Sequence, residues 1–145
     1  MRSSRAIAIN LAIMIYIWSS SSFTYYLASF QLKYLPGDIF DNSIASAFAQ
    51  SLGIIISGVF TKFFNKKQAL IISYAISFVG GLLILFFGES SVGLMPFFVG
   101  VARIGISAGF NLIYLMNAEV FPTLFAATAM GICNLLARII TILSP

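Results

Sequence analysis

Two arginines lie inside long apolar stretches of this sequence, and they are the residues best placed to do chemistry. Arg103 is the one charge in the fourth stretch, and Arg138 is the one charge in the fifth. A charge at the bilayer centre costs about 3 kcal/mol on insertion scales, so such residues turn inward and mark a site by default. The four acids fall instead at the ends of stretches: Asp38, Asp41, Glu89 and Glu119.

The counter-charge for these arginines is therefore expected to be water, an anionic ligand or an acid on another polypeptide. Arg103 has two interpretations. It either pairs with an acid or with backbone carbonyls and holds helices in register, or it belongs to a site. For Arg138 we favour a role in lining a pathway. Ten residues of helix span about 15 Å, so both arginines lie at comparable depth in neighbouring helices.

Four of the stretches carry polar or small residues at spacings of three and four, which places each set on one side of a helix. Packing between membrane helices accounts for such faces in general, and it is the simpler explanation in the second stretch. Two arginines with two asparagines in the fourth and fifth exceed what packing needs. The sets are Trp18, Ser22, Tyr25 and Ser29; Ser43, Ser46, Gln50, Gly53 and Ser57; Arg103, Ser107, Asn111 and Tyr114; and Asn134, Arg138 and Thr141.

The elements that position these residues must be membrane-spanning helices. Sixty per cent of the 145 residues are hydrophobic and 8% are charged, against roughly 25% charged in soluble domains. A span needs about 20 apolar residues. The sequence predicts an all-α integral membrane protein, a single domain over 1–145, whose short loops keep neighbouring helices antiparallel and in contact. The expected spans are Ala6–Phe30, Asn42–Phe63, Gln68–Phe87, Gly93–Ala118 and Leu124–Ser144.

The charge distribution predicts orientation rather than nucleic-acid binding, although the net charge is +4. Arg2 and Arg5 precede the first span, and a lysine cluster lies between the second and third. The positive-inside rule therefore places the N-terminus in the cytoplasm, with the bilayer as the surrounding partner. With no His and one Cys, disulfides within the chain and the common zinc sites are excluded. We expect no cofactor and no enzymatic activity, because no phosphate loop or nucleophile–base set is present.

Several motifs resemble the major facilitator superfamily, most of all its organic-cation and organic-anion transporter branch. Gly105–Phe110 is similar to that branch's GISAAF-like run, and Ala118–Thr123 to its AELYPT-like run. Leu35–Asn42 looks like its LxGNIYLN connection, and Arg138 precedes Pro145 by seven residues, as an arginine or aspartate does in the branch. The resemblance covers nearly the whole chain and implies spans seven to eleven of a twelve-helix fold, an incomplete C-terminal half.

The resemblance also implies roles for individual residues. Arginine at the position of Arg138 is typical of anion carriers and aspartate of cation carriers, which favours organic anions here. Glu119 would pair with Lys66 or Lys67 at an inner gate, and Gln50 stands where the branch usually has Glu. The residues expected to line the central cavity and bind substrate are Trp18, Tyr25, Phe110, Asn111 and Arg138.

These observations predict part of a secondary carrier for small organic ions, working by alternating access in the plasma membrane. Its missing N-terminal half would be the main partner. Two alternatives stay open at this point. The chain could be a non-transporting membrane fragment or scaffold from a truncated gene, or a homo-oligomeric pore lined by the Arg138 faces of several copies.

Overall fold

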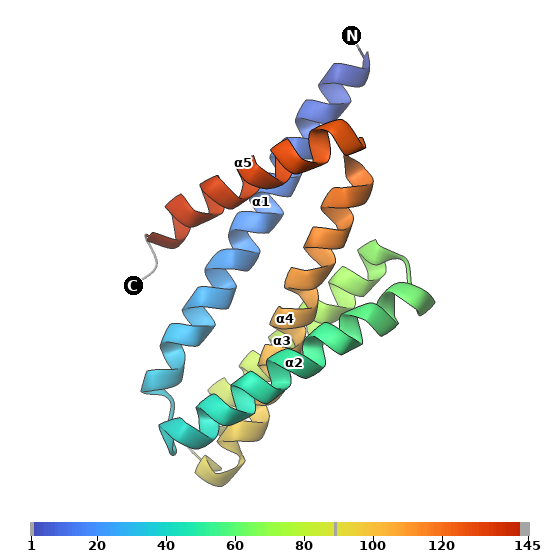
Figure 1. Ribbon diagram of the computed structural model, residues 1–145. Helices are drawn as coiled ribbons and strands as arrows, with labels where there is room; N and C mark the ends of the chain where they lie inside the picture. Colours follow the sequence, from blue (N-terminus) through green and yellow to red (C-terminus); the bar gives the residue numbers. More distant parts are fainter. Residues whose placement is uncertain (1, 89, 143–145) are drawn as a thin grey trace.

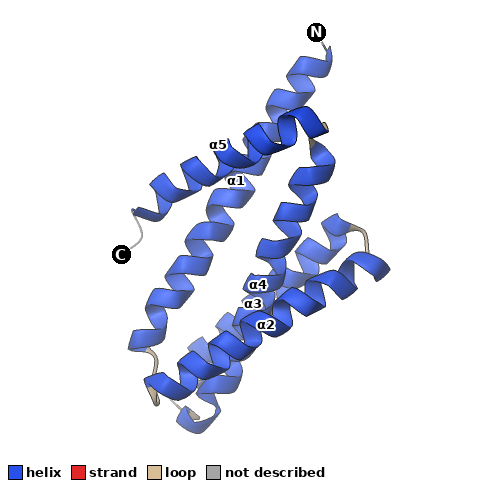
Figure 2. Ribbon diagram, in the orientation of Figure 1, coloured by secondary structure: helices blue, strands red, loops and turns tan. Residues whose placement is uncertain are grey.

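The computed structural model describes residues 2–88 and 90–142, and these form five long helices with short connections (Figure 2). Each helix is long and apolar enough to cross a membrane. The protein is thus an all-helical, multi-pass membrane protein. The predicted end of the last span at Ser144, and Glu89 and Pro145, lie outside the described residues. The helices are α1 (Arg2–Gln31), α2 (Ile39–Phe63), α3 (Lys66–Phe87), α4 (Met95–Val120) and α5 (Thr123–Ile142), with the short 3-10 turns η1 (Leu32–Tyr34) and η2 (Val92–Leu94).

The helix ends follow from local chemistry. Asp38 begins α2 by accepting a hydrogen bond from the Phe40 amide at 2.8 Å, as N-cap residues do. Gly37 precedes it with a φ of 100°, a backbone conformation that residues other than glycine rarely adopt. Pro96 lies in the first turn of α4, where the missing amide proton costs nothing. Pro122 separates α4 from α5 because the residue before a proline avoids helical geometry.

The sequence neighbours α3 and α4 pack closely, as the short loops led us to expect, but the expectation is wrong for α1 and α2. Within the described part of the chain, the backbones of α1 and α2 do not approach each other closely, although a short connection joins them. Instead, α2 and α3 flank α4, and α5 lies along α1 (Figure 1). A short loop keeps only two helix ends together, so the packing partner is decided by the shape of each helix face.

Small residues explain these partners. A methyl group at Gly105 of α4 would lie 2.4 Å from the Ser77 nitrogen of α3, and one at Gly53 of α2 would lie 2.8 Å from the Ile104 carbonyl oxygen of α4. The backbones are therefore in close approach. On α5, three small buried residues recur every fourth position and face α1: Ala129, Cys133 and Ala137. Such small-residue contacts let membrane helices approach closely.

Candidate functional site: a central cavity with one arginine

A partly open cavity of about 290 Å³ lies between α1, α2, α4 and α5. The polar faces expected from the sequence meet here. Of the described residues that line the cavity, Arg138 alone is charged. The lining consists of Ser22, Tyr25, Tyr26, Gln50, Ile54, Ser107, Phe110, Asn111, Tyr114, Asn134, Ala137, Arg138 and Thr141.

Arg138 is held by a tyrosine of the neighbouring helix. Its Nη1 donates a hydrogen bond to the Tyr26 hydroxyl at 2.6 Å, and the guanidinium carbon lies 5.5 Å from the Tyr26 ring centroid. A guanidinium has five N–H donors, and Tyr26 takes one of them in the described contacts. The others remain available for carboxylate oxygens, which arginine binds with two parallel hydrogen bonds.

Tyr25 is the centre of a second set of contacts. Gln50 donates a hydrogen bond from its side-chain Nε2 to the Tyr25 hydroxyl at 2.8 Å. The Ser107 hydroxyl donates to the backbone carbonyl of Gln50 at 2.9 Å. Because the Tyr25 oxygen accepts this bond, its own proton stays available. These bonds connect α1, α2 and α4 at the cavity wall.

Aromatic rings form the rest of the wall. Phe110 stacks on Tyr25 with a centroid distance of 5.6 Å and an interplanar angle of 29°. Tyr114 meets Phe110 edge-on at 5.5 Å. Asn111, also on α4, lines the same cavity. Ring faces attract organic cations, so the wall complements Arg138 chemically.

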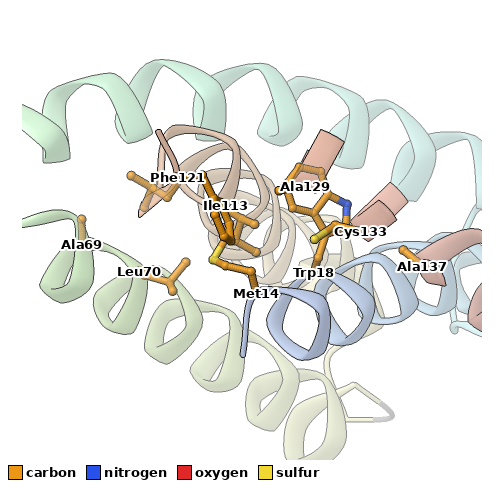
Figure 3. Close-up of a cluster of buried hydrophobic side chains, with 10 residues drawn as sticks. Met14, Trp18, Ala69, Leu70, Ile113, Phe121, Ala129, Cys133 and Ala137 are labelled. Atoms are coloured by element: carbon orange, nitrogen blue, oxygen red, sulfur yellow. The ribbon is translucent and has the colours of Figure 1, made fainter. Parts of the chain in front are cut away.

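Trp18 does not line the cavity, and this corrects its expected place. The side chain is fully buried at 0% exposure and packs among small residues of α5, Ala129, Cys133 and Ala137 (Figure 3). Its ring meets Tyr114 edge-on at 4.5 Å. Helical spacing correctly placed Trp18 on the side of α1 that faces α4 and α5. The large indole is nevertheless packed between these helices and does not reach the cavity surface.

Arg103 also lies outside the central cavity. It is 4% exposed and lines a separate, mostly apolar cavity between α1, α3 and α4. Its Nη2 donates to the Ser29 hydroxyl at 2.6 Å, and its Nη1 to the Tyr25 carbonyl at 3.4 Å. The two arginines therefore contact neighbouring tyrosines of α1 rather than each other.

The expected gating residues lie at the other end of the bundle. Lys66, at the start of α3, forms an ion pair with Glu119 in the last turn of α4. Lys67 is exposed and has no carboxylate partner within residues 2–88 and 90–142. The pair joins two helix ends that already pack against each other.

Sequence reasoning missed Tyr26. It lies one residue after Tyr25, about 100° further around the helix at 3.6 residues per turn, and so falls off the stripe that begins at Trp18. The sequence nevertheless indicated such a role, because two adjacent tyrosines point to different sides of α1 and can contact different helices. Tyr26 contacts Arg138 on α5.

Known transporters are similar to this chain. Organic cation/carnitine transporter 2 of Homo sapiens is 26% identical over 90% of this chain and 24% of its own length. Solute carrier family 22 member 4 of Mus musculus is 25% identical over 97% of this chain and 26% of its own length. Putative transporter svop-1 of Caenorhabditis elegans is 31% identical over 74% of this chain and 20% of its own length. No family model and no solved structure matches the chain.

The chain thus spans about a quarter of the length of these curated relatives. Where their names state a substrate, they state organic cations and carnitine, which gives no support to the sequence-based preference for organic anions. The relatives are transporters and not enzymes. Over most of its length, the chain is thus distantly homologous to organic cation/carnitine transporters.

Proposed function

We propose that this chain, as one membrane domain over residues 1–145, is part of the C-terminal half of a secondary transporter for small organic ions. The observation that carries the proposal is the cavity shared by four helices, whose described lining combines one arginine with several aromatic residues. Secondary carriers bind substrate near the membrane midplane and expose the site alternately to each side. An N-terminal half would complete the cavity and rock against this one.

Its substrate, in this proposal, is a zwitterion with one carboxylate and one organic cation. Arg138 would bind the carboxylate with two hydrogen bonds, assisted by Asn111. Phe110 and Tyr114 would offer ring faces to the cationic group. Carnitine, which the name of a relative gives, combines a quaternary ammonium with a carboxylate and fits both halves of the cavity.

We further propose that the carrier acts in the plasma membrane with the N-terminus of this chain in the cytoplasm. The lysines at Lys62, Lys66 and Lys67 support this orientation through the positive-inside rule. The pair of Lys66 and Glu119 would then close the cytoplasmic end of the bundle while the cavity faces outside.

Uptake by the complete gene product tests the proposal with three probes: carnitine as the zwitterion, tetraethylammonium as the cation and benzoate as the anion. We expect saturable uptake of carnitine. Hydrogen bonds to charged groups contribute about 1.5–3 kcal/mol, so Arg138→Gln should raise the KM for carnitine by about tenfold or more. The same variant should leave the KM for tetraethylammonium unchanged or lower it, because that cation has no carboxylate and is repelled by a positive charge in the cavity.

Lys62→Gln is the matched control, since it removes one positive charge from an exposed position in the last turn of α2. It should leave both KM values unchanged. Equal effects of Arg138→Gln on all probes would contradict the assignment of Arg138 to the carboxylate. Absence of saturable uptake of any probe, with normal surface expression, would favour a non-transporting role.

A further inference from the structure

Arg103 is a buried charge that the central cavity does not use. Its side chain is 4% exposed, and no carboxylate within residues 2–88 and 90–142 pairs with it. All three of its contacts are with α1. They are the hydroxyl of Ser29, the backbone carbonyl of Tyr25 and the aromatic ring of Tyr25. A buried charge is costly unless several groups compensate it. The short hydrogen bond goes to Ser29, and the two longer contacts hold the backbone and the ring of Tyr25, so Arg103 helps to set the position of Tyr25.

Arg103 cannot reach a substrate in the central cavity directly. It lines the other cavity, of about 260 Å³, which is bordered by α1, α3 and α4. Tyr25 lies between the two and lines the central cavity. The contacts that connect Arg103 to the wall of the central cavity therefore run through Tyr25.

The surroundings of Tyr25 decide which part of it a substrate can use. Phe110 stacks on the ring, Tyr26 meets it edge-on at 5.6 Å, and the Arg103 guanidinium carbon lies 5.4 Å from its centroid. A second cation on this ring would be repelled by the first. The hydroxyl, in contrast, accepts a hydrogen bond from Gln50 and keeps its own proton for an acceptor.

Helix α4 fixes this arrangement from two points. Arg103 contacts the backbone carbonyl and the ring of Tyr25. Ser107, one turn further along α4, donates a hydrogen bond to the backbone carbonyl of Gln50. Gln50 in turn holds the hydroxyl of Tyr25. The ring and the hydroxyl are thus oriented by the same helix.

We propose that Arg103 is a positioning residue that determines specificity: it occupies the ring of Tyr25 and directs the Tyr25 hydroxyl, rather than the ring face, to the substrate. The inference rests on the proposed function, because it assigns the Tyr25 hydroxyl to the carboxylate of the transported ion. Arg103 thereby makes Tyr25 a hydrogen-bond donor instead of a cation-binding surface.

A double-mutant cycle in the complete protein tests this, with Arg103→Met, Tyr25→Phe and the double variant. Each single change should raise the KM for carnitine about three- to tenfold and leave the KM for tetraethylammonium unchanged or lower. Because Arg103 acts through the Tyr25 hydroxyl, the double variant should be no worse than Tyr25→Phe alone, since coupled residues are non-additive. Arg103→Lys keeps the charge over the ring and should restore a large part of the carnitine affinity.

A role limited to holding α1 against α4 gives a different result. Arg103→Met would then lower the amount of protein at the surface and the Vmax for both probes, with effects that multiply with those of Tyr25→Phe. That outcome overturns the inference.

A second measurement does not depend on transport. The thermal unfolding midpoint of the purified complete protein is compared for Arg103→Met, Tyr25→Leu and their combination. If neither probe is taken up, the proposed function fails, and this cycle alone decides whether Arg103 acts on Tyr25. Non-additive shifts support the contact, and additive shifts overturn it.

Discussion

At the level of single residues, the cavity wall depends on side chains that do not face the cavity. Trp18 is fully buried behind it and contacts two wall residues, Tyr114 at 4.5 Å and Phe110 at 6.4 Å between ring centroids. Aromatic pairs in edge-on geometry contribute about 0.5–1.5 kcal/mol beyond area burial. Trp18 is therefore a packing residue for the site.

Truncation of Trp18 should reduce stability more than substrate preference. Trp18→Ala is expected to cost about 3–5 kcal/mol, as for other large aromatic truncations in cores, while Trp18→Phe should cost less. The thermal unfolding midpoint of the purified protein measures the loss. Tyr16→Ala is the control, because Tyr16 lies two residues earlier on α1 and is 76% exposed. A larger effect of Tyr16→Ala than of Trp18→Ala would contradict this assignment.

At the level of elements, α4 organises the bundle because other helices approach its backbone so closely. The side of α4 that faces α3 has glycine at Gly105 and Gly109, and α3 returns a glycine at Gly80. The added methyl at Gly80 would lie 2.4 Å from the Ala102 nitrogen. The contacts at Gly105 and Gly80 involve backbone atoms, which cannot move aside as flexible side chains do.

Gly105→Ala should therefore separate α3 from α4. Its methyl would lie 2.4–2.8 Å from backbone atoms of Ser73 and Ser77, and overpacking of this kind costs about 1–3 kcal/mol. We expect a lower unfolding midpoint and less protein in the membrane. Gly58→Ala provides the comparison, since a methyl there has no neighbour within 4 Å and alanine favours the helix. Equal behaviour of the two variants would refute the close approach.

The ion pair of Lys66 and Glu119 joins the same two helices at one end. Glu119 is 61% exposed at its side chain and Lys66 27%, so the pair should contribute at most about 1 kcal/mol to stability. If it closes the inner end of the carrier, Glu119→Ala should lower the uptake rate without lowering the unfolding midpoint by more than that.

Exchange of the charges gives the sharper experiment. The combined variant Lys66→Glu with Glu119→Lys should recover the uptake rate that either single reversal loses, because the attraction is restored. Lys67→Glu is the matched reversal at an exposed neighbour that lacks a carboxylate partner among residues 2–88 and 90–142. Unchanged uptake and surface expression in Glu119→Ala would rule out the gating role.

At the level of the whole molecule, composition predicted the class correctly because apolar runs of membrane length have one stable form, the spanning helix. Helical spacing also brought Tyr25, Phe110, Asn111 and Arg138 to one cavity. Spacing alone could not separate a cavity-lining residue from one packed behind it, as Trp18 shows. Spacing also could not identify which helices pack together. Helix α1 packs against α5, at Ala129, Cys133 and Ala137, and not against its sequence neighbour α2.

The orientation of the bundle in the membrane can be tested with single cysteines. Cys133 is fully buried, so the native chain should give little background reaction with a membrane-impermeant maleimide. Tyr34→Cys places a thiol in η1 between α1 and α2, where the side chain is 76% exposed. Asn65→Cys places one between α2 and α3, beside Lys66 and Lys67. Lysine-rich loops stay on the cytoplasmic side, so intact cells should label Tyr34→Cys, and Asn65→Cys should react only after permeabilisation.

The reverse pattern would invert the proposed topology and would put the pair of Lys66 and Glu119 at the outer end, where it could not act as an inner gate. Labelling of both variants in intact cells would contradict α2 as a spanning helix.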